Sequence, residues 1–295
     1  MFFKQEELVK YCDENNKHIY DIVLEEEVKR SQTDEESVKE KLREMVHVME
    51  GSAMACMNEG RPTQMNLVNG YSKRINEYNK SGKSLCGDMI NNLMSMAFST
   101  IECNAAMGKI VAAPTAGSSG ILPAVLMEYK RQHPDVTEDD FVNALLTATG
   151  IGQIIGRYAS FAGADGGCQA ECGSASAMAA AALVELQGGT IEQICNAASI
   201  TILNILGLVC DPIGGIVEYP CGFRNASGAV NAYISADMAM ANAFSVVPFE
   251  QVTMAMGEVG RALPSALRET GLGGVAGTPV GAKIRDEFFN KVKES

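Results

Sequence analysis

The spacing of apolar residues over roughly the first 50 positions predicts charged, amphipathic helices. After the segment "TDEE" at 33–36, Val38, Leu42, Met45 and Met49 recur every three or four residues, which places them on one helical face. "TDEE" has the order of a capping box, with threonine at the cap and glutamate three residues later. We therefore expect an outer helix that packs through a single apolar stripe.

Beyond this helix the pattern changes twice. Residues 60–84 are polar and contain several glycines, which predicts a loop on the surface. From residue 89 the run "DMINNLMSMAFSTIECNAAMGKI" predicts a buried helix that ends near Gly108.

Helix boundaries farther along the chain are marked by capping residues. Thr137 and Thr190 stand at N-cap positions, and the helix after Thr190 is expected to stop at Gly207. Pro248 opens another helix, where its missing N–H costs nothing. Strand signals are limited to "KIVAA" and "GIVEY", which lack a βαβ spacing. We predict an all-α fold in a single domain, 1–295, with a more polar helical portion at 1–85 and a core at 86–295.

Composition and charge exclude several classes of partner. The formal net charge is −12 and no basic stripe stands out, which argues against nucleic acid and anionic membranes as partners. The first residues lack the apolar core of a signal peptide, and no run of about 18 strongly apolar residues occurs. We expect a soluble, cytoplasmic protein.

The segment 151–236 is poor in charge and is therefore expected to be largely buried. Buried charges are costly unless they are paired or functional, so chemistry is expected where they occur. The charged residues of this segment are Arg157, Asp165, Glu171, Glu185, Glu192, Asp211, Glu218 and Arg224.

Three glycine-rich joints carry the candidate chemistry. In the first, "APTAGSSGILPAVL" (113–126), hydroxyls and backbone N–H groups precede an apolar helix, which suits a carboxylate or a phosphate. A plain serine-capped helix start is the alternative. The other two joints each carry two cysteines: Cys168 and Cys172 in "GADGGCQAECGSASAMAA" (163–180), and Cys210 and Cys221 in "CDPIGGIVEYPCGFRNASGAV" (210–230).

The chain has nine cysteines and three histidines. In a reducing compartment, clustered cysteines more often bind metal or take part in chemistry than form disulfides. Zinc usually takes four ligands in close Cys/His pairs, and ferredoxins have their own spacing; neither pattern is present. Three thiolates on glycine-rich turns are compatible with a [4Fe–4S] cluster that leaves one iron open, or with buried thiols alone. We assign the cysteines outside the joints to the core: Cys12, Cys56, Cys86, Cys103 and Cys195.

Three blocks of the sequence, "NAAMGKIVAAPTAGSSGILPAVL", "GADGGCQAECGSASAMAAAALVEL" and "LGLVCDPIGGIVEYPCGFRNASGAVNA", resemble the signature blocks of the iron–sulfur L-serine dehydratases. The resemblance extends over roughly residues 100–245, and the length resembles that of the alpha chain of the two-subunit form. It implies an all-helical catalytic domain in which Cys168, Cys210 and Cys221 hold a [4Fe–4S] cluster, with Cys172 as a neighbour and not a ligand. Such a cluster is expected to be lost from a preparation made in air.

The resemblance also implies a reaction. L-Serine is dehydrated to aminoacrylate, which hydrolyses to pyruvate and ammonia, with the open iron as Lewis acid. Arg224 is a candidate partner of the substrate carboxylate, and its alternative interpretation is as the partner of Asp211 or Glu218. The base is not assigned: candidates are Glu171, Asp165, Lys73 and His47, or a group of a partner chain. Candidate contacts of the substrate or the cluster surroundings are Thr115, Ser118, Ser119, Asn104, Arg224 and Asn225.

Two family features are not found in this sequence. One is the Ser-Ser-Ser-His-Thr segment of the regulatory beta part. The other is the terminal cysteine that some single-chain members use as a fourth cluster ligand, because this sequence ends "FFNKVKES". The resemblance therefore implies a separate beta chain in an alpha–beta assembly, and an open iron position filled by water or by a partner residue.

Alternatives to serine dehydration stay open at this point. The same scaffold could act on L-cysteine and release sulfide. A pyridoxal-phosphate lyase could hold its phosphate with "TAGSSG", but it needs a Schiff-base lysine in an apolar context, and segment 151–236 has none. An iron–sulfur sensor or electron carrier would need every iron protected, and the three ligands and the serine-rich joint argue against it.

Overall fold

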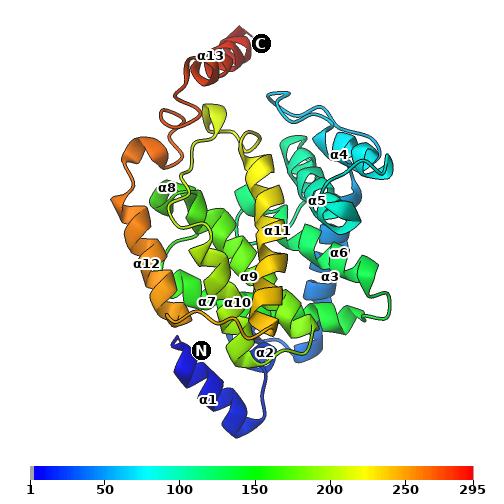
Figure 1. Ribbon diagram of the computed structural model, residues 1–295, viewed down its shortest axis with the longest axis vertical. Coiled ribbons are helices and arrows are strands. Elements are labelled where there is room, and N and C mark those ends of the chain that lie inside the picture. The colour runs from blue at the N-terminus through cyan, green and yellow to red at the C-terminus, as the bar shows by residue number, and fades with distance from the viewer. Residues whose placement is uncertain (1–2, 295) are drawn as a thin grey trace.

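The computed structural model describes residues 3–294, which fold into helices joined by short loops (Figure 1). Within these residues there is no strand, and one isolated bridge joins Cys210 to Arg268. The all-α prediction is confirmed. The long helices are α1 (Gln5–Asn15), α2 (Ile19–Ser31), α3 (Glu35–Met54), α4 (Tyr71–Lys80), α5 (Gly87–Ala105), α6 (Ile121–Gln132), α7 (Glu138–Tyr158), α9 (Ser174–Leu186), α10 (Ile191–Leu203), α11 (Cys221–Met240), α12 (Phe249–Ala262) and α13 (Pro279–Glu294). The short helical turns are η1 (Ala116–Ser118), α8 (Gly163–Gly166), η2 (Gln169–Gly173), η3 (Ile213–Gly215) and η4 (Ser265–Leu267).

Helix α9 lies at the centre of the fold and is packed by α6, α7, α10 and α11 (Figure 1). Its sequence, "SASAMAAAALVEL", is dominated by alanine, and these alanine side chains are fully buried. Small side chains let neighbouring helices approach closely. The charge-poor segment that was expected to be buried therefore does supply the core.

The other helices surround this centre. α5 packs against α4 and α11, while α2 and α3 pack against α7. α1 and α13 lie at opposite ends of the long axis of the molecule (Figure 1). Met65, Ile213 and Ala276 form a small second apolar cluster, on which α13 is seated against η3. α13 thus contacts the loop between Cys210 and Cys221. No helix of residues 3–294 has the length and apolar character that crossing a membrane needs.

The helix starts that were predicted at Thr137, Thr190 and Pro248 are confirmed. The Thr137 hydroxyl accepts a hydrogen bond from the Asp140 N–H at 3.2 Å, and Thr190 does the same for Gln193 at 3.2 Å. Both sites are full capping boxes, since the third residue of each helix bonds back to the cap N–H. Pro248 stands directly before α12, as expected.

The predicted start of α3 is wrong by one residue. The cap is Asp34, whose carboxylate accepts a 2.9 Å bond from the Ser37 N–H, so the helix begins at Glu35. Met45 is also misplaced, because it is 43% exposed while Val46 is buried. The buried stripe therefore runs through Val38, Val46 and Met49, with Val46 in place of Met45.

Two further boundaries differ from the sequence prediction. Residues 60–84 are not one loop, because they contain α4, whose buried residues include Ser72 and Asn76. Tyr71, Ile75 and Tyr78 recur at helical spacing, but α4 is short and otherwise polar, so the prediction missed it. The helix after Thr190 stops at Leu203 instead of Gly207.

Candidate active site

The three glycine-rich joints meet in the folded chain. The Thr115 hydroxyl, in the first joint, donates a 2.8 Å hydrogen bond to Glu171 Oε1 in the second. The other carboxylate oxygen of Glu171 lies 3.9 Å from Cys210 Sγ, at the start of the third. Glu171 therefore contacts all of the sequence regions that were predicted to carry chemistry.

Asn225 ties the first joint to the third. Its Oδ1 accepts from the Gly120 N–H at 2.9 Å, and its Nδ2 donates to the carbonyls of Gly117 and Cys221 at 2.8 and 2.9 Å. The side chain is fully buried, and these bonds occupy both ends of its amide. Asn225 therefore acts as a structural clamp between the serine-rich turn and the N-terminus of α11.

The three predicted cluster cysteines are buried at these joints. Cys168 precedes η2, Cys210 lies between α10 and η3, and Cys221 is the first residue of α11; their exposed fractions are 2%, 3% and 7%. Burial, and then the negative charge of Cys168, raise the pKa values of Cys210 and Cys221. The three thiols are thus close enough for their charges to interact.

Cys172 modifies the chemistry of Cys168. The two Sγ atoms are in hydrogen-bond contact at 3.3 Å, and this contact lowers the pKa of Cys168. The same contact and full burial raise the pKa of Cys172. Cys168 is therefore the thiol of this pair that ionises first, as a metal ligand must.

Glycine makes the space around Cys210. A Cβ atom on Gly163 would lie 2.7 Å from Cys210 Sγ and 3.0 Å from Glu171 Oε2, which is closer than side-chain atoms approach. Gly167, directly before Cys168, has a φ of +77°, a conformation that other residues rarely adopt. Position 163 therefore needs glycine for the close approach of Cys210, and position 167 needs it for its backbone conformation.

The loop from Cys210 to Cys221 is held by two buried carboxylates. Asp211 accepts from Arg224 Nη2 and from the Val275 N–H, both at 2.6 Å. Glu218, which is fully buried, accepts from the Thr63 hydroxyl at 2.6 Å and from the N–H groups of Met65 and Leu67 at 2.6 and 3.0 Å.

The backbone of Cys210 adds a third attachment. Its N–H donates to the Leu267 carbonyl at 2.9 Å, and its carbonyl accepts from the Glu269 N–H at 2.7 Å. Segments from both ends of the sequence thus hold this loop, so the position of its two cysteines is determined by long-range contacts.

Arg224 takes one of the two roles that its sequence position allowed, as the partner of Asp211. Its Nη2 pairs with Asp211, but Nη1 is buried and has no hydrogen-bond partner. A buried guanidinium N–H without an acceptor is costly, which marks this atom as a site for an anionic ligand. A pocket of about 610 Å³ adjoins the arginine and is lined also by Cys172, Asn204, Phe223 and Ser227.

The remaining candidate substrate contacts, Ser118, Ser119 and Asn104, differ in their burial. The Ser118 and Ser119 hydroxyls are buried within the first joint, where Ser118 contacts Thr115 Oγ1 at 3.0 Å and Ser119 donates to the Ala116 carbonyl at 2.8 Å. Asn104 is half-buried in the last turn of α5.

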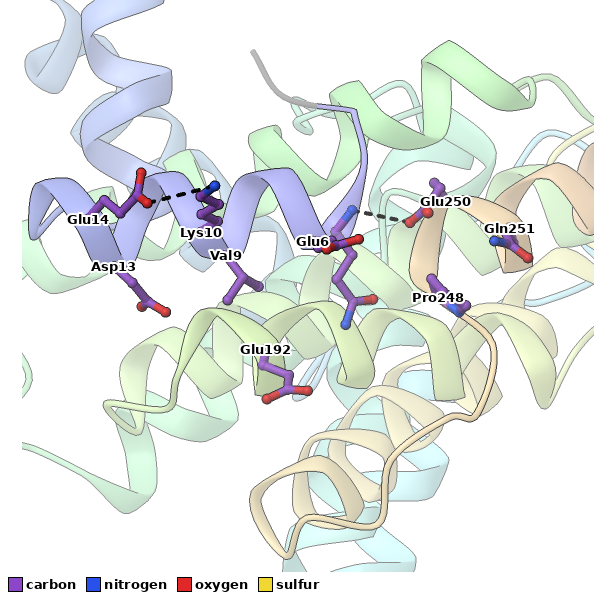
Figure 2. A pocket seen from close by; sticks show the side chains of 10 residues that line it. Glu6, Val9, Lys10, Asp13, Glu14, Glu192, Pro248, Glu250 and Gln251 are labelled. Carbon is purple, nitrogen blue, oxygen red and sulfur yellow. Dashed lines mark hydrogen bonds and ion pairs between the residues drawn. The ribbon is translucent and has the colours of Figure 1, made fainter.

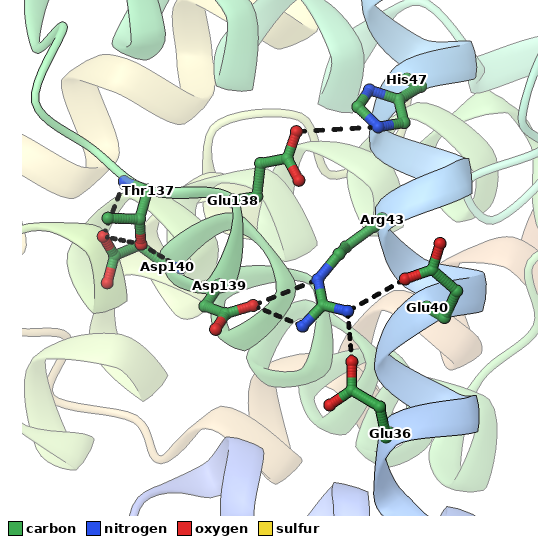
Figure 3. A network of polar contacts seen from close by, with 8 residues as sticks. All are labelled: Glu36, Glu40, Arg43, His47, Thr137, Glu138, Asp139 and Asp140. Atoms are coloured by element: carbon green, nitrogen blue, oxygen red, sulfur yellow. Dashed lines mark hydrogen bonds and ion pairs between the residues drawn. The ribbon is translucent and has the colours of Figure 1, made fainter.

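Of the four candidate bases, Glu171 and Asp165 lie in the second joint, and only Glu171 contacts the other two joints. Burial raises the pKa of its carboxyl group, against the effect of the Thr115 hydrogen bond. Asp165 is exposed and accepts from Ser160 at 2.9 Å, and Lys73 pairs with Glu77 at 3.8 Å on the surface of α4. His47 faces Glu138 at 3.7 Å, in the polar network between α3 and the start of α7 (Figure 3).

A second cavity, also of about 610 Å³, contains none of the predicted site residues. It lies between α1 and the starts of α10 and α12, where Glu6, Asp13, Glu14 and Glu192 face it (Figure 2). Lys10 pairs with Glu14 at 3.9 Å there, and the Gln5 N–H donates to Glu250. Size alone therefore does not identify the active site of this chain.

The arrangement of the cysteines limits the kind of metal group that the site could hold. Within residues 3–294, no three Cys, His, Asp or Glu side chains converge on one point as a single ion requires. Three buried thiols without histidine suit an iron–sulfur cluster, which spreads its thiolate ligands around several iron atoms. The donor set fits such a cluster.

The assignment of isolated cysteines to the core is confirmed with one exception. Cys12, Cys56, Cys103 and Cys195 are buried, but Cys86 is exposed, because it lies in the polar connection before α5. The sequence interpretation also missed the anchoring role of Glu218 and of its partner Thr63. The available signal was that an acidic residue in a charge-poor segment must be paired.

Comparison with known proteins extends these observations. Residues 14–276 match the family described as "Serine dehydratase alpha chain". The chain is 56% identical over 285 residues to "L-serine dehydratase, alpha chain" of Peptoniphilus asaccharolyticus, with 97% of each chain covered. It is 43% identical over 289 residues to "Probable L-serine dehydratase, alpha chain" of Bacillus subtilis, with 98% of this chain and 96% of the relative covered.

A longer relative is matched over only part of its own length. "L-serine dehydratase 1" of Escherichia coli is 35% identical over 281 residues, which cover 92% of this chain but 60% of the relative. That protein therefore contains a further segment outside the region that matches this chain.

Proposed function

The chain belongs to the serine dehydratase alpha chain family, and on this premise we propose that it is the catalytic chain of an L-serine dehydratase. The reaction removes the Cα proton and the hydroxyl of L-serine as water, and the resulting aminoacrylate hydrolyses to pyruvate and ammonia. The observation that carries the proposal is the meeting of three buried cysteines and Glu171 at the glycine-rich joints. The enzyme is a carbon–oxygen lyase of amino acid degradation in the cytoplasm.

Cys168, Cys210 and Cys221 are the proposed ligands of a [4Fe–4S] cluster. When bound, such a cluster with one iron open to the substrate supplies a Lewis acid that polarises the C–O bond of the leaving hydroxyl. Gly163 leaves the space beside Cys210. The bonds of Asp211 and Glu218 hold the loop that carries two of the three thiols, so the chain itself keeps the ligands in place.

The substrate carboxylate is the proposed partner of Arg224. Asp211 holds Nη2 and orients the guanidinium, which leaves the unpartnered Nη1 to donate to a carboxylate oxygen. The Thr115 hydroxyl and the turn that contains Ser118 and Ser119 are proposed to bind the other end of the substrate. Asn225 positions this turn through the N–H of Gly120.

The proton acceptor is proposed on geometry. Glu171 is the one sequence candidate that contacts both Thr115 and Cys210, whereas Lys73 and His47 are paired elsewhere. A group from a second chain is the competing source. The 60% coverage of the longer relative supports a separate beta chain, which we propose as the partner in an alpha–beta heterodimer.

The test is anaerobic reconstitution with iron and sulfide of the full chain together with its beta chain. Pyruvate formation from L-serine and bound iron per chain are measured for the wild type and for Cys210→Ala. We expect activity in the wild type, and loss of both iron and activity in the variant. Iron-loaded protein that leaves L-serine untouched contradicts the proposal, and faster release of sulfide from L-cysteine would identify a desulfidase on the same scaffold.

A further inference from the structure

Cys168 and Cys172 form a thiol pair in the interior of the molecule. Their Sγ atoms lie 3.3 Å apart, and both side chains are buried. Cys168 stands directly before the π-helical turn η2 and Cys172 lies within it, so the two residues are one turn apart on the same face. Among residues 3–294, this is the one pair of cysteine sulfurs in hydrogen-bond contact. The proposed reaction gives Cys172 no role.

A pocket adjoins the pair. Cys172 forms part of the wall of the pocket of about 610 Å³ that Phe223 and Arg224 also line, although its side chain is buried. A small oxidant in this pocket therefore lies beside the pair, and each thiol is the nearest thiol to the other once one sulfur is oxidised.

The two sulfurs are in contact but not at bonding distance. A disulfide has an S–S length of about 2.05 Å, so the two atoms must approach by little more than 1 Å. Residues one helical turn apart have Cβ atoms about 5–6 Å apart and a disulfide needs about 3.5–4.5 Å, so the turn must tighten by about 1–2 Å while both side chains rotate.

We propose that Cys168 and Cys172 form a reversible disulfide when the chain without iron meets hydrogen peroxide. Peroxide oxidises one sulfur of the pair to a sulfenic acid and releases one water. The other thiol then attacks this sulfur, the sulfenic oxygen leaves as a second water, and the S–S bond forms. The two sulfurs lose the two electrons that reduce the peroxide, and a dithiol reductant reverses the change.

The disulfide has a direct consequence for the site. A cysteine without a neighbouring thiol proceeds from sulfenic to sulfinic and sulfonic acids, which a dithiol does not reduce. The pair instead holds Cys168 in a recoverable form until iron is available again. Cys210 and Cys221 have no such partner within hydrogen-bond distance, so the protection applies to Cys168 alone.

The test uses the full chain freed of iron and kept under anaerobic conditions. It is treated with stoichiometric hydrogen peroxide, unfolded, alkylated and mapped by peptide mass. We expect Cys168 and Cys172 to escape alkylation in a peptide that has lost two hydrogen atoms, and dithiothreitol to restore both thiols. The exposed Cys86 reports the effective dose of peroxide. Oxidised Cys86 together with fully alkylated Cys168 and Cys172 would overturn the proposal.

Two kinds of variant complete the test. Cys172→Ala and Cys172→Ser should form no disulfide, and their Cys168 should advance to the sulfinic acid, so that dithiothreitol no longer restores iron binding. Cys195→Ala removes a buried cysteine outside the pair and should behave as the wild type. Circular dichroism confirms that each variant is folded. Recovery of Cys168 in the folded Cys172 variants to the wild-type extent also overturns the proposal.

Discussion

Thr115 and Glu171 are 56 residues apart in the sequence and are joined by a hydrogen bond of 2.8 Å. The bond connects the serine-rich turn to the turn that follows Cys168. A Cβ on Gly117 would stand 2.8 Å from the same carboxylate oxygen, so the contact also needs the absence of a side chain. The close approach of the first two joints therefore depends on a hydroxyl, a carboxylate and a glycine.

Thr115→Val keeps the volume of the side chain and removes its hydrogen-bond donor. A buried carboxylate that loses a partner costs about 1–3 kcal/mol, so we expect kcat/KM for L-serine to fall about 10- to 100-fold. Iron per chain should stay at the wild-type level, because no proposed ligand moves. Thr115→Ser retains the hydroxyl and should recover most of the activity. Equal kcat/KM in the valine variant and the wild type would show that the bond has no part in the reaction.

Gly163→Ala places a methyl group 2.7 Å from Cys210 Sγ. The thiol or Glu171 must then move, and we expect loss of most of the bound iron after anaerobic reconstitution and a parallel loss of pyruvate formation. Gly51→Ala is the matched control, since nothing lies within 4 Å of its added Cβ. That variant lies inside α3 and should be stabilised slightly, by about 0.5–1 kcal/mol. Normal iron content in Gly163→Ala would contradict the ligand assignment of Cys210.

Arg224→Lys preserves the charge but has one terminal nitrogen instead of a planar fork. A lysine that pairs with Asp211 has no second group for the substrate, so we expect the KM for L-serine to rise about tenfold or more. Steady-state kinetics and iron analysis separate this effect from cluster loss. An unchanged KM would place the substrate carboxylate elsewhere.

Glu218→Ala leaves the Thr63 hydroxyl and the N–H groups of Met65 and Leu67 without their acceptor. Each unsatisfied buried donor costs about 1–3 kcal/mol, so the free energy of unfolding should fall by about 3 kcal/mol or more. Urea unfolding measures this loss, and faster hydrogen exchange at Met65 and Leu67 locates it. Glu258→Ala, at an exposed position of α12, should have almost no effect. Unchanged exchange at the two amides would contradict the anchoring role.

The buried Glu102 should make the free energy of unfolding depend on pH. Burial raises the pKa of this carboxyl group above its unfolded value, although the N–H groups of Ser72 and Gly70 donate to it at 2.7 and 2.9 Å. The folded state therefore holds the proton to higher pH, and this group lowers stability as pH rises from about 4.3, the unfolded value, through the folded value.

The measurement compares urea unfolding of the wild type and Glu102→Gln at pH 5 and pH 7. The glutamine cannot ionise, so the loss of stability between pH 5 and pH 7 should be smaller in the variant. Its amide provides one acceptor where the carboxylate provides two, so its stability at pH 5 should be lower than that of the wild type. A larger pH-dependent loss in the variant would reverse the sign assigned to Glu102.

Local sequence signals predicted much of the helical framework. Thr137, Thr190 and Pro248 mark helix starts correctly because capping chemistry acts within three or four residues. α4 was missed because its inward face includes Ser72 and Asn76 and it is anchored by the distant Glu102. Tyr71 and Ile75, one turn apart, pack on the core, but the helix is short and otherwise polar, so its composition obscured this spacing.

The sequence by itself determined the helical class, the buried charge-poor segment and the motif blocks that carry the family resemblance, because these depend on residue type and short spacing. Only the tertiary structure decided that Glu171 meets Thr115, that Asn225 joins two joints, and that Arg224 shares its guanidinium between Asp211 and an open position. These partners are brought together by helix packing across large separations in the chain. Hydrogen bonds and burial depend on where side chains lie in space, and local patterns along the sequence do not contain that information.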